Sequence, residues 1–101
     1  MALQVRIAVQ AANQVRKASE WWLVNRPNAP HAIAIATDFG EAVAFLAEQP
    51  GIGAKYEGSR TLGVRRLFLS RVGYFIYYKS EKGFLHVLAF WHASREHQPA
   101  L

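Results

Sequence analysis

Basic side chains gather in and around one apolar stretch in the second half of the chain. The segment GVRRLFLSRVGYFIYY, residues 63–78, places arginines among leucine, phenylalanine and isoleucine side chains. The complete set of basic candidates is Lys55, Arg60, Arg65, Arg66, Arg71 and Arg95. Because a guanidinium group binds a phosphate or a carboxylate through two parallel hydrogen bonds, such a set could bind a polyanion.

Tyrosines near these arginines could add stacking surfaces to such a site, because aromatic rings stack on nucleic acid bases. The tyrosines are Tyr56, Tyr74, Tyr77 and Tyr78. In a strand, Arg65 and Arg66 point to opposite faces, so at least one of them lies on a face that helices do not cover. The alternative is that the arginines are solvated charges that keep sheet edges from aggregating.

Hydrophobic spacing indicates one strand and two helices in the first half of the chain. Residues 3–9 alternate apolar with more polar side chains, which predicts a strand. Apolar residues at helical intervals predict a first helix over residues 11–25 and a second from Asn28 to Gln49, with Asn28 as its cap. The connection between them is short, so the two helices should form an antiparallel hairpin.

Three further strands are expected in the second half. Residues 64–70, 74–79 and 84–91 are rich in aromatic and branched side chains and are separated by short turns. The order β-α-α-β-β-β predicts an α+β fold in which the helical hairpin packs on a small antiparallel sheet. At 101 residues the chain should form a single domain, residues 1–101.

The composition restricts the partners. Twelve lysines and arginines against seven acidic residues give a net charge of +5, which favours a polyanion, either nucleic acid or an acidic protein segment. There is no cysteine, and His92 and His97 have no obvious third ligand, so we expect no disulfide, metal or cofactor. The apolar runs are too short to cross a bilayer and no signal peptide is evident, so we expect a cytoplasmic protein without membrane contact.

Trp21 and Trp22 occupy consecutive positions of the first predicted helix. Consecutive helical positions point in different directions, so at least one of the two indoles must diverge from the core. Packing within the helical hairpin accounts for most of their expected contacts. The diverging indole could contribute to a surface that binds a partner protein.

Several segments together resemble the RelE/ParE family of type II toxin–antitoxin toxins. They are EQPGIG after the second helix, the arginine segment quoted above and the closing FLHVLAFWHASR, and they follow one another in the family's order. The resemblance covers essentially the whole chain. It implies a bacterial protein that inhibits growth and is neutralised by a cognate antitoxin, with which it could form a hetero-oligomer.

The family has two branches with different targets. RelE-like members cleave mRNA on the ribosome, whereas ParE-like members are associated with inhibition of DNA gyrase. RNA cleavage needs groups that activate the 2′-hydroxyl, stabilise the phosphate and protonate the leaving oxygen. By resemblance to the RelE branch, the candidates for these roles are Lys55, Arg65, Arg95 and His97, with Arg66 in place of Arg65 if the register differs.

The end of the chain favours the ParE-like branch. The C-terminal tyrosine of the RelE branch is missing, and His97 is the main residue that could replace it. The ending HASRE resembles the ParE pattern of a histidine, two small residues, an arginine and an acidic residue. We therefore expect a gyrase inhibitor. The alternatives are a ribosome-dependent mRNA endoribonuclease and a non-toxic basic module that binds an acidic peptide, so enzymatic activity stays open.

Arg65 and Arg95 have the strongest case for a direct role in toxicity. We expect Leu67 and Leu69 to set the direction of Arg65, and Arg95 to follow at the end of the last strand, so that both arginines are held close together. Replacing an exposed arginine by alanine should change stability by at most about 0.5 kcal/mol. Loss of either arginine should therefore abolish toxicity without unfolding the protein.

Overall fold

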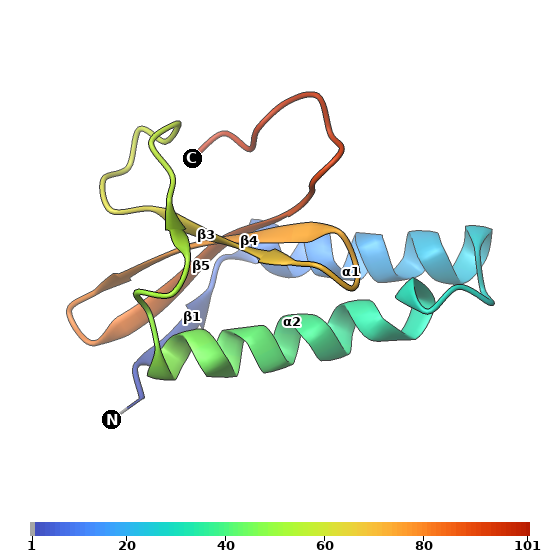
Figure 1. Ribbon diagram of the computed structural model, residues 1–101, viewed down its shortest axis with the longest axis horizontal. Coiled ribbons are helices and arrows are strands. Elements are labelled where there is room, and N and C mark those ends of the chain that lie inside the picture. Colours follow the sequence, from blue (N-terminus) through green and yellow to red (C-terminus); the bar gives the residue numbers. More distant parts are fainter. Residues whose placement is uncertain (1) are drawn as a thin grey trace.

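The computed structural model describes residues 2–101 as a helical hairpin packed on one face of a sheet (Figure 1). Its elements are β1 (Gln4–Ile7), α1 (Val9–Asn25), α2 (His31–Glu48), β2 (Ala54–Lys55), β3 (Arg65–Leu69), β4 (Tyr74–Glu81) and β5 (Phe84–His92). The α+β class and the predicted element order are confirmed, with β2 as a short additional strand. The helices in this part of the chain are too short or too polar to cross a membrane.

The sheet is mixed rather than wholly antiparallel. Its strand order is β1-β5-β4-β3-β2, and β1 runs parallel to β5 whereas the other pairs are antiparallel. The chain leaves β1, crosses one face as the helical hairpin and returns through four antiparallel strands, β2 to β5, so its last strand comes to lie beside its first. The turn between β4 and β5 has positive φ at Lys82 (53°) and Gly83 (84°), as a tight hairpin turn requires.

The two helices begin elsewhere than the sequence predicts. The first begins at Val9 rather than residue 11. The second begins at His31, and its N-cap is Pro30 without a side-chain cap, so the prediction that Asn28 caps this helix is wrong. The helix starts after the proline because φ of Pro30, −55°, already has the helical value.

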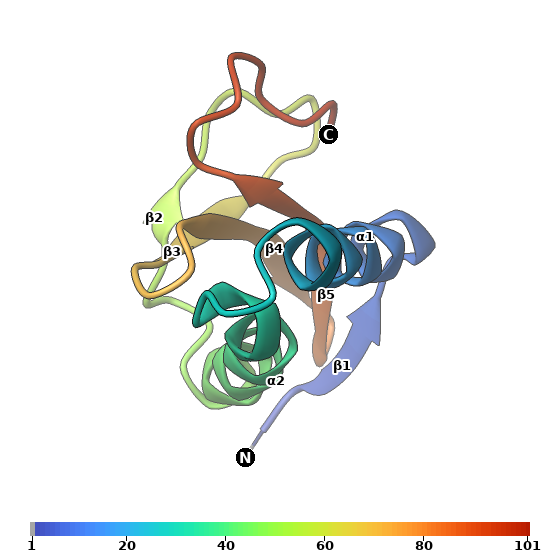
Figure 2. The ribbon, with the colours of Figure 1, turned by 90° about the vertical axis from the view of Figure 1, so that its right-hand side faces the viewer.

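Both faces of the sheet are covered, so neither face is an open surface for the basic residues. The main core lies between the helices and the sheet and includes the fully buried Ile35, Leu46, Ile76 and Leu85. A second cluster on the other face contains Val64, Tyr77 and Ala89, with Tyr56, Trp91 and Leu101 packed against it. Figure 2 shows the loop before β3 and the segment after β5 on the side of the sheet away from the helices. The expected open basic face is therefore largely covered by chain.

Candidate functional site

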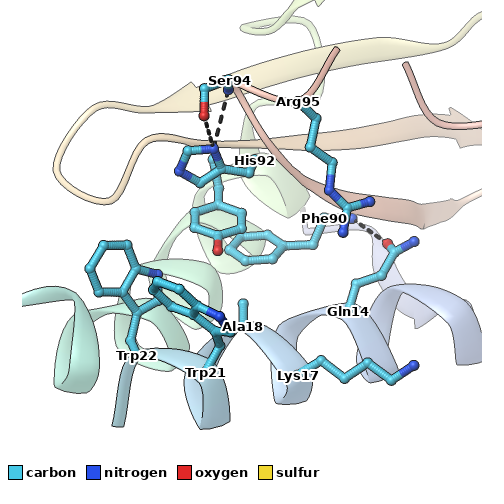
Figure 3. A pocket seen from close by; sticks show the side chains of 10 residues that line it. Gln14, Lys17, Ala18, Trp21, Trp22, Phe90, His92, Ser94 and Arg95 are labelled. Carbon is cyan, nitrogen blue, oxygen red and sulfur yellow. Dashed lines mark hydrogen bonds between the residues drawn. The ribbon is translucent and has the colours of Figure 1, made fainter. Parts of the chain in front are cut away.

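A cavity of about 450 Å³ lies between α1 and the end of β5 (Figure 3). We call it the tryptophan groove. Its lining consists of Gln14, Lys17, Ala18, Trp21, Trp22, Tyr74, Phe90, His92, Ser94 and Arg95. Two of the residues that the sequence suggested for partner binding and one predicted functional arginine therefore meet in a single hollow.

The two tryptophans have different roles in this groove. Trp22 is partly buried and stacks on His31 at the start of α2, with ring centroids 4.2 Å apart. Trp21 is 53% exposed and meets Trp22 edge to face, with ring centroids 5.0 Å apart. Trp22 thus joins the two helices, whereas Trp21 leaves an apolar surface exposed, and the sequence predicts that one of the two indoles diverges from the core.

The floor of the groove is aromatic and uncharged. Tyr74 and Phe90 are stacked, with ring centroids 4.5 Å apart, and His92 lies edge-on to Tyr74. Burial, together with the nearby positive charge of Arg95 and His31, lowers the pKa of His92 below its ordinary value of 6.5. The Nδ1 atom of His92 accepts a hydrogen bond from the backbone N–H of Ser94 at 3.2 Å, which requires that nitrogen to be unprotonated.

Two basic side chains stand at the rim of the groove. Lys17 extends from α1, and Arg95 follows β5 with its guanidinium carbon 4.1 Å from the centroid of the Trp91 ring. Within residues 2–101 neither side chain forms an ion pair with a carboxylate. An aromatic floor with an unpaired positive rim is suited to a peptide segment that combines apolar and acidic side chains.

Lys17 and Gln14 are functional candidates that sequence reasoning missed. Lys17 lies four residues before Trp21, so the two share one helix face, and this spacing is a signal that could have identified it. Gln14 accepts a hydrogen bond from the backbone N–H of Phe90 at 2.8 Å, and Gln10, one turn earlier, donates to the carbonyl of Leu88 at 2.9 Å. These glutamines attach α1 to β5 beyond the end of β1 and so fix the position of the groove.

Arg65 lies elsewhere and has a structural role. Its Nη1 donates to the carbonyl of Gly53 at 2.7 Å and to that of Gly51 at 3.4 Å. Tyr78, which is paired with Arg65 in the sheet, anchors the same loop by donating to the Pro50 carbonyl at 2.8 Å. Arg65 and Lys55 line a second hollow of about 460 Å³.

The expectation that Arg65 and Arg95 are held close together is wrong. Arg65 pairs with Tyr78 in the middle of β4, whereas Arg95 follows His92, which pairs with Tyr74 at the start of β4. The antiparallel hairpin therefore separates the two arginines along the sheet, and they line different hollows. The order of strands in the sequence does not show how far along a neighbouring strand each arginine lies, because this depends on the register of pairing.

Arg71 and Arg60 also make contacts with residues far away in the sequence, which sequence spacing could not predict. Arg71 forms a two-pronged ion pair with Asp38 of α2, in which its Nε is 2.9 Å from one carboxylate oxygen. This pair ties the turn after β3 to the helical hairpin, and it leaves Arg71 unsuited to a target phosphate. Arg60 is exposed in the loop before β3, and its backbone N–H donates to the carbonyl of Leu101 at 2.8 Å.

Arg66 lies on the face away from the helices. Its guanidinium carbon is 4.3 Å from the centroid of the Phe75 ring, and its Nη1 donates to the hydroxyl of Tyr77 at 3.2 Å. Tyr77 and Tyr78 are each 0% exposed, so the expectation that they offer stacking surfaces for bases is wrong. Their rings fill the two cores because alternate residues of β4 face opposite sides of a sheet that is covered on both.

The candidate catalytic residues are not assembled in one place. Lys55 and Arg65 share the second hollow, whereas Arg95 lies over Trp91. His97 is exposed, and its carbonyl accepts a hydrogen bond from the Trp91 indole at 2.6 Å. The expected RelE-like set thus divides into two pairs, because Arg95 and His97 both contact Trp91, away from the hollow of Lys55 and Arg65. Arg66, the alternative to Arg65, contacts Gln98, which is next to His97.

Comparison with known proteins identifies the family. The family model of the ParE toxin of the type II toxin–antitoxin system parDE matches residues 5–97. The chain belongs to the ParE toxin family. It is thus the toxin of a type II toxin–antitoxin system, as the sequence resemblance predicts, and this class of system implies a cognate antitoxin.

A solved structure shares the fold of this ParE-family toxin. It is from a chromosomal ParDE toxin–antitoxin system of P. aeruginosa, with a TM-score of 0.74 and 19% sequence identity. The match covers 92% of this chain and 98% of the other. The comparison with curated proteins gives no significant match.

The position of Arg65 leads to a prediction about stability. Arg65→Ala should lower the free energy of unfolding by about 1 to 2 kcal/mol, because a charged hydrogen bond to the Gly53 carbonyl is lost. This exceeds the 0.5 kcal/mol expected for an exposed arginine. Urea denaturation of both proteins measures the difference. Arg60→Ala is the matched control, and equal midpoints for the two variants would contradict the anchoring role.

The depressed pKa of His92 leads to a second prediction. As the pH falls below about 6.5, His92 takes up a proton in the unfolded chain before it does so in the native state. The free energy of unfolding should therefore fall between pH 6.5 and the lower native pKa of His92. Above pH 6.5 the contribution is fully present. His92→Gln should reduce the difference between urea midpoints at pH 7.5 and pH 5.5. An unchanged pH dependence in His92→Gln would contradict the assignment.

Proposed function

We propose that this toxin arrests bacterial growth by inhibiting DNA gyrase, and that it does so without cleaving RNA. The observation that carries the proposal is the match of the ParE toxin family model to residues 5–97. General acid–base cleavage requires its groups within hydrogen-bonding reach of one phosphodiester. The separation of Lys55 and Arg65 from Arg95 and His97 supports the same direction. A gyrase inhibitor acts in the cytoplasm, where we place the toxin.

We also propose that the cognate antitoxin neutralises the toxin by placing an acidic segment in the tryptophan groove. Trp21 would contact apolar side chains of this segment, and Lys17 and Arg95 would contact its carboxylates. The net charge of +5 favours such a partner. A segment of this kind is expected to be disordered alone and to become ordered on binding, giving a toxin–antitoxin hetero-oligomer.

Two assays on one protein preparation test the proposed target. Purified toxin should block the conversion of relaxed plasmid to supercoiled plasmid by gyrase and ATP, and antitoxin added beforehand should restore it. The same toxin should leave mRNA intact in a translating extract. Codon-dependent mRNA cleavage with unimpaired supercoiling would overturn the proposal in favour of a RelE-like endoribonuclease, with His97 as the candidate acid.

Growth provides the test of toxicity itself. Induced expression of the toxin alone should arrest bacterial growth, and co-expression of the antitoxin should relieve the arrest. Harmless accumulation of folded toxin at high level would instead support a basic module that binds an acidic peptide without toxicity.

A further inference from the structure

The segment after β5 folds back over the face of the sheet that the helices leave free (Figures 1 and 2). We call residues 96–101 the strap. The Trp91 indole donates to the carbonyl of His97 at 2.6 Å, and the backbone N–H of Arg60 donates to the carbonyl of Leu101 at 2.8 Å. Pro99 is buried, and Leu101 packs against the second core. The strap is thus an ordered cover held by a small number of contacts.

Two donors converge beneath the strap on one oxygen atom. The Oε1 atom of Gln98 accepts hydrogen bonds from the hydroxyl of Tyr77 at 2.7 Å and from Nη1 of Arg66 at 3.4 Å. Tyr77 is fully buried, and its hydroxyl also accepts from Arg66, so the two donors hold each other in place. The rings of Phe75 and Tyr56 lie 4.3 and 5.4 Å from the guanidinium carbon. The result is a preorganised cradle for one planar, oxygen-bearing group.

The present occupant does not match the charge of this cradle. Within residues 2–101, Arg66 has no carboxylate at ion-pairing distance, and its acceptor is the neutral carboxamide of the exposed Gln98. A carboxylate has the same planar shape as a carboxamide and forms stronger, charge-assisted hydrogen bonds with a guanidinium group. The cradle is therefore better suited to a carboxylate than to the side chain it holds.

We propose that Arg66 and Tyr77 form a carboxylate-binding site that Gln98 fills in the free toxin and that an acidic side chain of the target protein takes over by displacing the strap. The identity of the partner as the toxin's target rests on the function proposed above, whereas the carboxylate site does not. Gln98 competes from within the same chain at high effective concentration, so the strap sets a threshold for target binding.

A charge placed on the strap itself tests the site. Gln98→Glu delivers a carboxylate to the cradle, so hydrogen exchange of the Trp91 indole N–H and of the Arg60 amide should slow at least about fivefold. Gln98→Ala should accelerate both. Gln4→Glu, which adds the same charge at the far edge of the sheet, should change neither, and Gln98→Glu should lose its effect in an Arg66→Gln background.

The outcomes separate this proposal from the proposed function. If the Trp91 indole N–H and the Arg60 amide exchange as fast in Gln98→Glu as in Gln4→Glu, there is no carboxylate site. If inorganic phosphate slows their exchange in Gln98→Ala but glutarate does not, the site recognises phosphate instead. Either result overturns the proposal. Growth arrest should weaken in Gln98→Glu and persist in Gln98→Ala, and unchanged arrest in Gln98→Glu would overturn displacement of the strap. If the unmodified toxin fails to arrest growth, the proposed function fails, and the exchange measurements still decide the carboxylate site.

Discussion

Gly53→Ala should lower the free energy of unfolding by about 2 to 4 kcal/mol, which combines overpacking with the loss of a buried hydrogen bond. A Cβ atom at this position would lie 2.4 Å from the Tyr78 hydroxyl and 2.8 Å from the Arg66 carbonyl. The backbone N–H of Gly53 also donates to that hydroxyl at 2.9 Å, so any shift that relieves the clash breaks this bond. Urea denaturation at neutral pH measures the effect.

Gly51→Ala provides the matched control. It lies two residues earlier in the same loop, and a Cβ atom there would meet nothing within 4 Å. Its unfolding free energy should stay within about 0.5 kcal/mol of the unmodified protein. If both alanine variants lose stability equally, loop entropy rather than the close contact with Tyr78 governs this segment. If neither does, the anchoring of the loop by Tyr78 is contradicted.

Reversing both rim charges of the tryptophan groove should weaken antitoxin binding at least about 100-fold, because two favourable charge contacts become repulsive. The change is Lys17→Glu with Arg95→Glu. Both side chains are exposed and lack carboxylate partners within residues 2–101, so the fold should tolerate the substitutions. Isothermal titration calorimetry with purified antitoxin measures the affinity, and circular dichroism melting checks the fold.

The control for this experiment reverses a charge far from the groove. Lys82→Glu lies in the turn between β4 and β5, at the opposite end of these strands from His92. It should reduce affinity by less than about threefold, since exposed charges beyond a Debye length are largely screened. Equal losses in Lys82→Glu and in a single groove variant would show that net charge alone guides the antitoxin. Undiminished binding by the doubly reversed toxin would place the antitoxin elsewhere.

The order of elements and the fold class could be predicted because they depend on local patterns. Each element has a characteristic period of apolar residues that is visible in the sequence. Examples are the alternation in residues 3–9, the helical spacing around Trp22 and the aromatic strands of the second half. The tight turn at Lys82 and Gly83 and the helix stop after Gln49 are equally local. The family resemblance rested on the same patterns in the same order, and the match of the ParE toxin family model to residues 5–97 confirms it.

The functional surface could be predicted only in part. Trp21 and Arg95 were expected to be functional candidates, and both line the tryptophan groove. Lys17 was missed although it shares a helix face with Trp21, because its place at the rim of the groove depends on the approach of β5 to α1. Their use by an antitoxin stays a prediction.

The sequence alone determined that this chain forms a helical hairpin and a sheet, that it is basic, and that it resembles the ParE toxins, because periodicity, charge and motif order are properties of a linear chain. Only the tertiary structure decided what each arginine does. Arg65 anchors a loop, Arg71 pairs with Asp38 and Arg66 lies beneath Gln98. The partners of these arginines are 12, 33 and 32 residues away in the chain. Contacts over such separations form only when the strands take their register and the chain covers both faces of the sheet, and no local pattern records them.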